Sequence, residues 1–253
     1  MNDISRERAP KQSPRIPALQ DAFRMFCFAC IAFVMQPSLV RPHEQAPISE
    51  EIEWTWEIRP QGVDPKLPNV LLLGDSISRS YFPQVAQDLK GVANVYLMAS
   101  STSVGDPRLP NQIAEFAALQ RVSFSVVHFN NGLHGWGYAE GLFKSGFPIF
   151  LQAIRKLPGH ANLIWATITP VKPEASNGAT NPRIDSRNEI ARAIVEADKI
   201  PVDDLHSLMR RHPDLYEDPF HFNTEGATLM GDQAAAIIKK ALEGKDHSQS
   251  NLY

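Results

Sequence analysis

Two short segments far apart in the chain combine residue types that can perform nucleophilic catalysis. Residues 70–77 read VLLLGDSI, and residues 218–221 read DPFH. A serine hydroxyl is a weak nucleophile unless a base removes its proton, and a histidine oriented by a carboxylate is such a base. Ser76 is therefore the candidate nucleophile, His221 the candidate base and Asp218 its orienting carboxylate.

The residues around Ser76 predict where its hydroxyl lies. An apolar strand that ends in a tight turn brings a side chain to the carboxyl edge of a sheet, where open α/β folds bind their ligands. We expect Asp75 to stabilise that turn through its own side chain. Glu217 is an alternative orienting carboxylate, although the three-residue spacing to the histidine favours Asp218.

Alternating strands and helices must hold these segments in place. Residues 51–59 alternate apolar and polar side chains, which predicts a half-buried strand, and residues 60–68 follow as a linker. Apolar runs predict parallel strands at 69–73, 93–97, 124–129, 163–167 and 200–202. Between and after them we predict helices at 78–89, 111–119, 142–157, 182–197 and 224–243. We expect Asn181, before Pro182, to cap one helix and Gly244 to end the last.

This order predicts an α/β protein of the flavodoxin-like kind. It is a three-layer α/β/α sandwich with a mostly parallel five-stranded sheet and one extra N-terminal strand. A length of 253 residues suits a single domain, which we place at residues 69–244. Residues 1–50 form a separate N-terminal segment, residues 51–68 the extra strand and its linker, and residues 245–253 a C-terminal tail.

The N-terminal segment has the pattern of an export signal. Basic residues lead into an apolar run at residues 25–35, which suits a signal-peptide core and is too short for a membrane span of ~20 residues. We therefore predict a periplasmic or extracellular protein, with an uncleaved anchor or a disordered segment as alternatives. Cys27 and Cys30 lie inside this run without the βαβ context of a redox motif.

Charge and spacing argue against several other functions. The net charge is −3 and no long block of one sign appears, so we expect no nucleic-acid partner. The eight histidines lack zinc-type spacing, and we expect neither a metal nor a cofactor. Asp203 and Asp204 could join Asp75 in a metal-dependent phosphotransfer site, but turn formation and helix capping are the favoured roles. The oligomeric state stays open.

The GDS sequence at residues 74–76, together with Asp218-x-x-His221, resembles the GDSL, or SGNH, superfamily of esterases and lipases. The resemblance extends over residues 69–243, with isoleucine replacing the usual leucine after the serine. It implies an oxyanion hole built from the serine, a glycine and an asparagine. Ser76 would donate its backbone N–H, and so would Gly105, the only glycine in its loop, unless that glycine instead supplies a positive φ.

The third block of the superfamily, Gly-x-Asn-Asp, is replaced by FNNGLHG at residues 129–135. Asn131 is the expected amide donor, Asn130 is the second choice, and His134 is a possible substitute or substrate contact. An Asn-Gly turn that merely ends the strand is the structural alternative. Trp136 could stack on a sugar ring or line an acyl pocket, or it could pin the loop.

These residues together predict hydrolysis of a carboxylic ester through an acyl-enzyme. The aromatic loop and the export signal favour an O-acetylated carbohydrate as substrate. The alternatives are a small-ester or lipid acylhydrolase, transfer of the acyl group to an alcohol, and a catalytically silent domain that binds carbohydrate or cell envelope. Reaction of the serine with an active-site phosphonate discriminates the enzymes from the silent domain.

Overall fold

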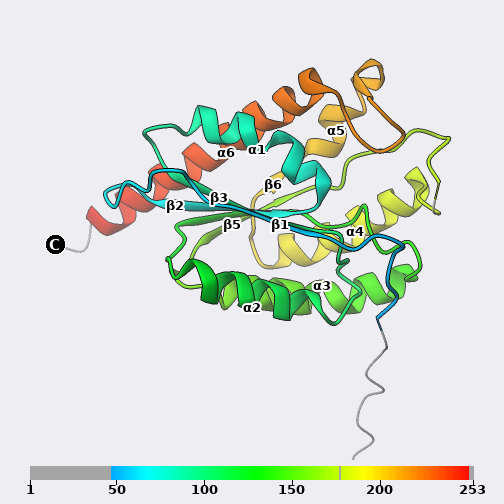
Figure 1. Cartoon of the computed structure of the whole chain (residues 1–253), viewed down its shortest axis with the longest axis horizontal. Coiled ribbons are helices and arrows are strands. Elements are labelled where there is room, and N and C mark those ends of the chain that lie inside the picture. The colour runs from blue at the N-terminus through cyan, green and yellow to red at the C-terminus, as the bar shows by residue number, and fades with distance from the viewer. Residues whose placement is uncertain (1–46, 177, 251–253) are drawn as a thin grey trace, which may run out of the picture. The chain divides into compact units, whose positions relative to one another are not determined.

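A central sheet with helices on both faces forms the described part of the chain (Figure 1). The computed structural model describes residues 47–176 and 178–250. The predicted export signal and its two cysteines therefore lie outside the described residues. The strands are β1 (Thr55–Ile58), β2 (Asn69–Gly74), β3 (Asn94–Ser100), β4 (Val126–Phe129), β5 (Asn162–Ala166) and β6 (Val202–Asp203).

Helices cover both faces of the sheet. One face is covered by α2 (Leu109–Gln120), α3 (Glu140–Arg155) and α4 (Asn181–Ala197). The other face is covered by α1 (Ser76–Asp88), α5 (Leu205–Met209) and α6 (Thr224–Ser250) (Figure 1). The predicted three-layer α/β/α sandwich is thus confirmed. Among the described residues, no helix has both the length and the apolar character needed to cross a membrane.

The strand order explains where a ligand can bind. The sheet runs β1-β3-β2-β4-β5-β6, with five parallel strands and β1 antiparallel to β3 at one edge. This confirms the predicted parallel sheet with one extra N-terminal strand. The chain leaves β2 towards β3 on one side and later returns to β4 on the other. Such a reversal opens a crevice at the carboxyl ends of the strands, here beside the residue that follows Gly74.

The central strands are apolar throughout because helices cover them on both sides. Residues 70–73 in β2 are almost completely buried, and so is every residue of β4. On α3 the apolar side chains that recur every three or four residues are buried as well, and Phe147 and Phe150 pack around Phe129 of β4. This core fixes the carboxyl ends of the strands relative to one another.

The N-terminal strand is shorter and more exposed than its alternation predicts. Ile52 precedes β1 and is 72% exposed, and Trp56 within β1 is 50% exposed, whereas Trp54 and Ile58 are partly buried. An edge strand has a neighbour on one side only, so α1 covers just part of its apolar side. Ile48, which falls in the predicted N-terminal segment, also contacts the sheet domain, because its backbone N–H donates to Tyr138 Oη at 2.6 Å.

Two predicted helix ends are wrong. Asn181 does not cap α4, whose N-cap is Thr180. Instead its side-chain amide accepts from Val171 N–H at 3.0 Å and donates to Val171 O at 2.8 Å, which ties the preceding loop to the helix. Gly244 does not end α6, because its φ is not positive and the helix continues to Ser250, within the predicted tail.

Candidate active site

The turn after β2 places Ser76 at the first position of α1. Asp75 is the N-cap, and its Oδ1 accepts from Ile77 N–H at 3.0 Å, as the sequence predicts. Gly74 allows this close turn, because a Cβ there would collide with the Ser78 side chain and lie 3.2 Å from Asn130 O. The serine therefore lies at the crevice that the strand order predicts.

Ser76, His221 and Asp218 come together in one hydrogen-bonded chain. Ser76 Oγ lies 2.7 Å from His221 Nε2, and His221 Nδ1 lies 2.8 Å from Asp218 Oδ2. An ionised carboxylate can only accept, so Nδ1 carries the proton and Nε2 is left as an acceptor for the serine hydroxyl. This is the arrangement in which a histidine can remove a proton from serine.

The loop from residue 217 to 221 holds the carboxylate in position. Asp218 Oδ1 accepts from Phe220 N–H and from His221 N–H, both at 2.7 Å. Partial burial acts to raise the pKa of Asp218, but these two N–H groups and the imidazole outweigh it and lower that pKa below its usual value. Glu217, the alternative carboxylate, is exposed, and its N–H donates to the backbone oxygen of His221.

The loop after β3 contains the predicted glycine. Gly105 lies against the ring of Tyr138, which a Cβ at this position would approach to 3.1 Å. Its φ is not positive, so the alternative that Gly105 serves as a left-handed turn residue is wrong. Among the described residues, neither the Gly105 N–H nor the Ser76 N–H has a hydrogen-bond acceptor.

The two asparagines after β4 bond to backbone groups. Asn130 donates to Ala166 O at 2.9 Å and to Thr167 O at 3.0 Å, and it is 3% exposed. Both of its N–H groups are used, so Asn130 has no amide N–H left to donate to an oxyanion. Asn131 accepts from Val104 N–H at 3.1 Å and donates to Thr102 O at 2.9 Å, which leaves one amide N–H.

Arg187 of α4 organises the rest of this loop, and sequence reasoning missed it. Its guanidinium donates to the backbone oxygens of Gly132, His134 and Gly135 at 2.7–3.1 Å. It also lies 4.0 Å from the ring centroid of Trp136. Burial lowers the pKa of Arg187 to about 10, and nearby Arg183 adds to that effect. In the sequence, the one feature that could have pointed to Arg187 is Arg183, which lies one helical turn before it on the predicted helix.

Trp136 does not offer a face to a ligand, which corrects its predicted substrate contact. It is only 9% exposed, its indole N–H donates to Leu133 O at 2.8 Å, and arginine side chains cover its ring. His134 stays partly exposed and pairs with Glu50 at 2.8 Å. Burial acts to lower the His134 pKa and to raise that of Glu50, but their mutual bond leaves the first raised and the second lowered.

The other acidic residues have structural roles. Asp204 caps α5 by accepting from Ser207 N–H at 3.1 Å, as predicted. Asp203 pairs with His128 at 2.8 Å in the core, where the sequence predicts only a turn residue. In the part of the chain that the structure describes, no cluster of three or more histidine, cysteine or acidic side chains is arranged to hold a metal ion.

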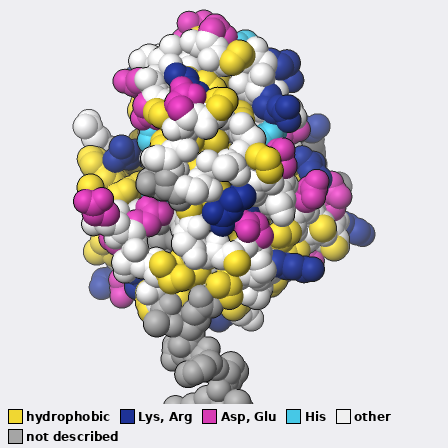
Figure 2. All heavy atoms as spheres, turned by 90° about the vertical axis from the view of Figure 1, so that its right-hand side faces the viewer, with side chains coloured by type: hydrophobic (Ala, Val, Ile, Leu, Met, Phe, Trp, Pro, Cys, Tyr) yellow, Lys and Arg dark blue, Asp and Glu magenta, His cyan; other side chains and the backbone are white. Residues whose placement is uncertain are grey.

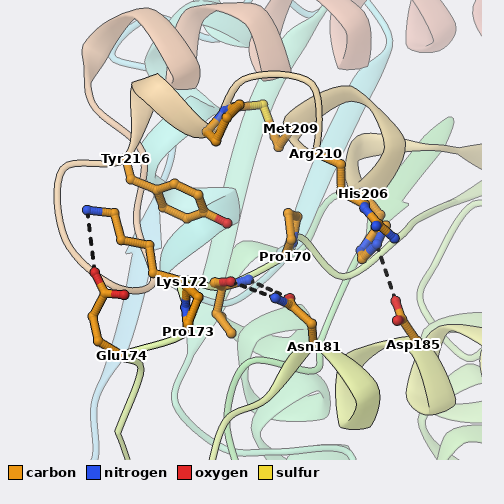
Figure 3. A pocket seen from close by; sticks show the side chains of 12 residues that line it. Pro170, Lys172, Pro173, Glu174, Asn181, Asp185, His206, Met209, Arg210 and Tyr216 are labelled. Carbon is orange, nitrogen blue, oxygen red and sulfur yellow. Dashed lines mark hydrogen bonds and ion pairs between the residues drawn. The ribbon is translucent and has the colours of Figure 1, made fainter.

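A cavity of about 430 Å³ borders the loop that leads to His221 (Figure 3). Lys172 and Tyr216 line it, and Lys172 N–H donates to Pro219 O at 2.9 Å. Ser76 and His221 are not part of its lining. Figure 2 views the face on which these loops gather, and acidic and basic side chains there are interspersed with hydrophobic ones.

Comparison with known proteins connects this geometry to a fold. No family model and no curated protein matches the chain in sequence. Solved structures do match, among them a carbohydrate esterase family 3 protein from Talaromyces cellulolyticus, with 17% identity, a TM-score of 0.55, and coverage of 70% of this chain and 99% of that one.

Two bacterial structures match equally well. The catalytic domain of peptidoglycan O-acetyltransferase A from Streptococcus pneumoniae has 17% identity and a TM-score of 0.53, covering 70% of this chain and 96% of its own. A lipase/acylhydrolase from Enterococcus faecalis has 19% identity and a TM-score of 0.53, covering 69% and 96%. The chain thus has the fold of the GDSL/SGNH hydrolases.

Proposed function

We propose that this protein is a serine esterase that cleaves carboxylic esters through an acyl-enzyme on Ser76. The observation that carries the proposal is the continuous chain from Ser76 Oγ through His221 to Asp218, with contacts of 2.7 and 2.8 Å. Ser76 lies on a strand-to-helix turn at the switch point of the sheet, where ligands bind in folds of this class. A fold shared with esterases and acylhydrolases agrees with it.

The reaction proceeds in two halves. His221 Nε2 takes the hydroxyl proton as Ser76 Oγ attacks the carbonyl carbon, and the tetrahedral intermediate collapses when His221 returns that proton to the departing alcohol. Water then gives a proton to His221 and attacks the acyl-enzyme. Collapse of the second intermediate releases the carboxylic acid and returns the proton to Ser76. Asp218 holds the ring in the required tautomer throughout.

The oxyanion would be stabilised by donors that have no other acceptor. The N–H groups of Ser76 and Gly105 are free in this sense among the described residues, and Asn131 keeps one amide N–H. The Ser76 N–H belongs to the first turn of α1, where backbone donors lack helical partners and favour negative charge. Loss of one such donor typically lowers the rate by ~10²–10³.

The substrate we propose is an O-acetylated carbohydrate. Two of the matching structures are described as a carbohydrate esterase and a peptidoglycan O-acetyltransferase, and both keep the same fold at low identity. Hydrolysis of small esters or lipids, as the name of the Enterococcus protein indicates for that protein, is the alternative. Export through residues 25–35 would place the enzyme where such glycans occur, and sequencing the N-terminus of the secreted protein tests that step.

The test combines labelling of the serine with turnover. The full chain is treated with a fluorophosphonate probe and assayed with p-nitrophenyl acetate, beside Ser76→Ala and the control Ser80→Ala on the same helix. Ser80 Oγ donates to Ile77 O at 2.8 Å and has no place in the proposed reaction. We expect labelling and turnover in the parent and in Ser80→Ala, and neither in Ser76→Ala. A folded parent that neither labels nor turns over would contradict the esterase proposal and favour the catalytically silent domain.

A further inference from the structure

A guanidinium group lies between two indole rings beside the candidate nucleophile. The Arg79 Cζ atom is 4.6 Å from the ring centroid of Trp56 and 5.3 Å from that of Trp54. Arg79 follows Ser76 by three residues on α1, a spacing that places both side chains on one face of a helix. The three side chains therefore form a single surface next to Ser76, here called the tryptophan–arginine shelf.

The sheet register fixes the position of this shelf. Trp56 of β1 is paired with Ala99 of β3, which is in turn paired with Gly74 of β2. Trp56 thus lies level with the strand end that leads into Ser76. Trp54, two residues earlier, points to the same side of the strand, and its backbone N–H donates to Ser101 Oγ at 2.9 Å. The shelf is consequently held by the pairing of β1 with β3, by the bonds of the Trp54 backbone to Ser101, and by helix α1.

The positive charge of Arg79 has no ion-pair partner among the described residues and is available to a ligand. Three acidic residues precede Trp54 closely in sequence. Glu53 pairs with Arg108 at 3.0 Å and Glu50 pairs with His134 at 2.8 Å, whereas Glu51 is exposed and forms no ion pair with Arg79 among the described residues. Arg79 is partly exposed, so a ligand at Ser76 can reach its N–H groups.

These features select one kind of ligand chemistry. A guanidinium presents a planar set of N–H donors that matches a carboxylate, and stacking on indole rings pre-orients it. Arg79 lies over the Trp56 ring, but the indole is still 50% exposed, unlike that of Trp136, and its exposed part is a flat apolar surface of the kind that packs against a sugar ring. We infer that the tryptophan–arginine shelf is a subsite for a carboxylate-bearing sugar, so that the substrate is an O-acetylated acidic glycan. This inference rests on the proposed esterase function.

The test compares substrates that differ in one group. The full chain is assayed with p-nitrophenyl acetate, with mono-O-acetylated methyl glucoside and with mono-O-acetylated methyl glucuronide, the sugars used as mixed positional isomers. The variants are Arg79→Gln and Trp56→Ala. The control is Arg155→Gln, which removes an equal charge at the C-terminal end of α3, where Arg155 pairs with Asp198 at 2.9 Å.

A carboxylate bound by Arg79 gives a specific pattern. We expect the parent to favour the glucuronide by about tenfold or more in kcat/KM, and Arg79→Gln to lower its kcat/KM on that substrate by about 10- to 100-fold, the range of a charge-assisted hydrogen bond. Turnover of the glucoside and of p-nitrophenyl acetate should change by less than about threefold. Trp56→Ala should lower turnover of both sugars but not of p-nitrophenyl acetate, and Arg155→Gln should match the parent.

Two outcomes overturn the inference, and they are distinguishable. A parent that turns over p-nitrophenyl acetate but shows no preference for the glucuronide retains the esterase function and has no acidic-sugar subsite. Equal losses on all three substrates in Arg79→Gln would mean that Arg79 only supports the nucleophile turn. Failure of the proposed function has a different signature, because the parent would then neither label with fluorophosphonate nor turn over any of the esters.

Discussion

Replacing Asp218 by asparagine tests whether the carboxylate sets the histidine tautomer. In the parent, Oδ1 accepts two backbone N–H groups at 2.7 Å and Oδ2 accepts from His221 Nδ1 at 2.8 Å. Asparagine can keep its oxygen on the two N–H groups, which turns its NH2 group towards Nδ1. The ring must then accept at Nδ1 and carry its proton on Nε2, where it can no longer receive the proton of Ser76.

The expected loss follows from the exposure of the site. In a serine protease whose triad aspartate is buried, this change lowers kcat by about 10⁴-fold because the wrong tautomer is favoured. The Asp218 side chain is 47% exposed, and water can partly replace it. We therefore expect Asp218→Asn to lower kcat/KM for p-nitrophenyl acetate by about 10²–10⁴, or about 3–5 kcal/mol in the activation free energy. The backbone contacts persist, so the free energy of unfolding should change by less than about 1 kcal/mol.

The control is Glu217→Gln, which removes the neighbouring charge. Glu217 is exposed and forms no recorded side-chain bond to His221 among the described residues, so this variant should stay within about threefold of the parent. Steady-state kinetics with urea unfolding on each variant provide both measurements. A loss below tenfold in Asp218→Asn, or a larger loss in Glu217→Gln, would refute the assignment of Asp218 as the orienting carboxylate.

Three further predictions concern the framework of the site. Because the pKa of Glu50 is lowered and that of His134 is raised, the pair stabilises the fold most between pH 4.5 and 6.5, which are the ordinary pKa values of the two groups. That contribution is lost as the pH rises through the His134 pKa or falls through the Glu50 pKa. Glu50→Gln should therefore cost about 1 kcal/mol in urea unfolding at pH 6 and less at pH 9, and an equal cost at both would exclude the ion pair. Gly74→Ala should lower the free energy of unfolding by about 1–3 kcal/mol, because the added methyl group collides with the Ser78 side chain at the nucleophile turn. Gly141→Ala on α3, where a Cβ meets open space, should raise the free energy of unfolding by up to about 1 kcal/mol. The opposite order of stabilities would refute this steric argument. Asp203→Ala should cost about 1–3 kcal/mol, because the buried His128 Nε2 and the Gln233 amide both lose their hydrogen-bond partner, and an unchanged free energy of unfolding would show that these bonds do not stabilise the core.

The strands and the two segments that carry Ser76 and His221 could be predicted because each has a recognisable local pattern. A parallel strand buried on both faces is apolar throughout, so residues 69–73 indicate β2 directly from the sequence. The turn at Asp75 and the three-residue spacing of Asp218 and His221 are equally local, and both appear as predicted in the geometry.

The loop residues could not be assigned because their partners are distant in sequence. An asparagine after a strand has the same local pattern whether its amide faces a ligand or, as in Asn130, the backbone of β5. Trp136 likewise lies in a loop and is of a residue type that often stacks on sugars. Only the structure shows that Arg187 packs against its ring and that the side chain is buried. The alternation of apolar and polar side chains predicts β1, but it does not predict that Trp56 is 50% exposed, because that depends on how far α1 extends over the sheet edge.

Within the tryptophan–arginine shelf only Trp56 is supported apart from the chemistry, because Arg79 shares α1 with Ser76 and Trp54 packs edge-on against His134 of the loop after β4, with ring centroids 5.6 Å apart. The nucleophile turn is held by Asp75 and the loop after β4 by Arg187, and neither contact involves β1. Trp56 belongs to the edge strand, where substitution disturbs few neighbours and no buried strand. A change at Trp56 should therefore alter which ester is bound while leaving the Ser76–His221 distance and the rate on a small ester nearly unchanged. Packing against the sugar ring would thus reside on β1, whereas binding of the carboxylate by Arg79 and attack by Ser76 would both reside on α1.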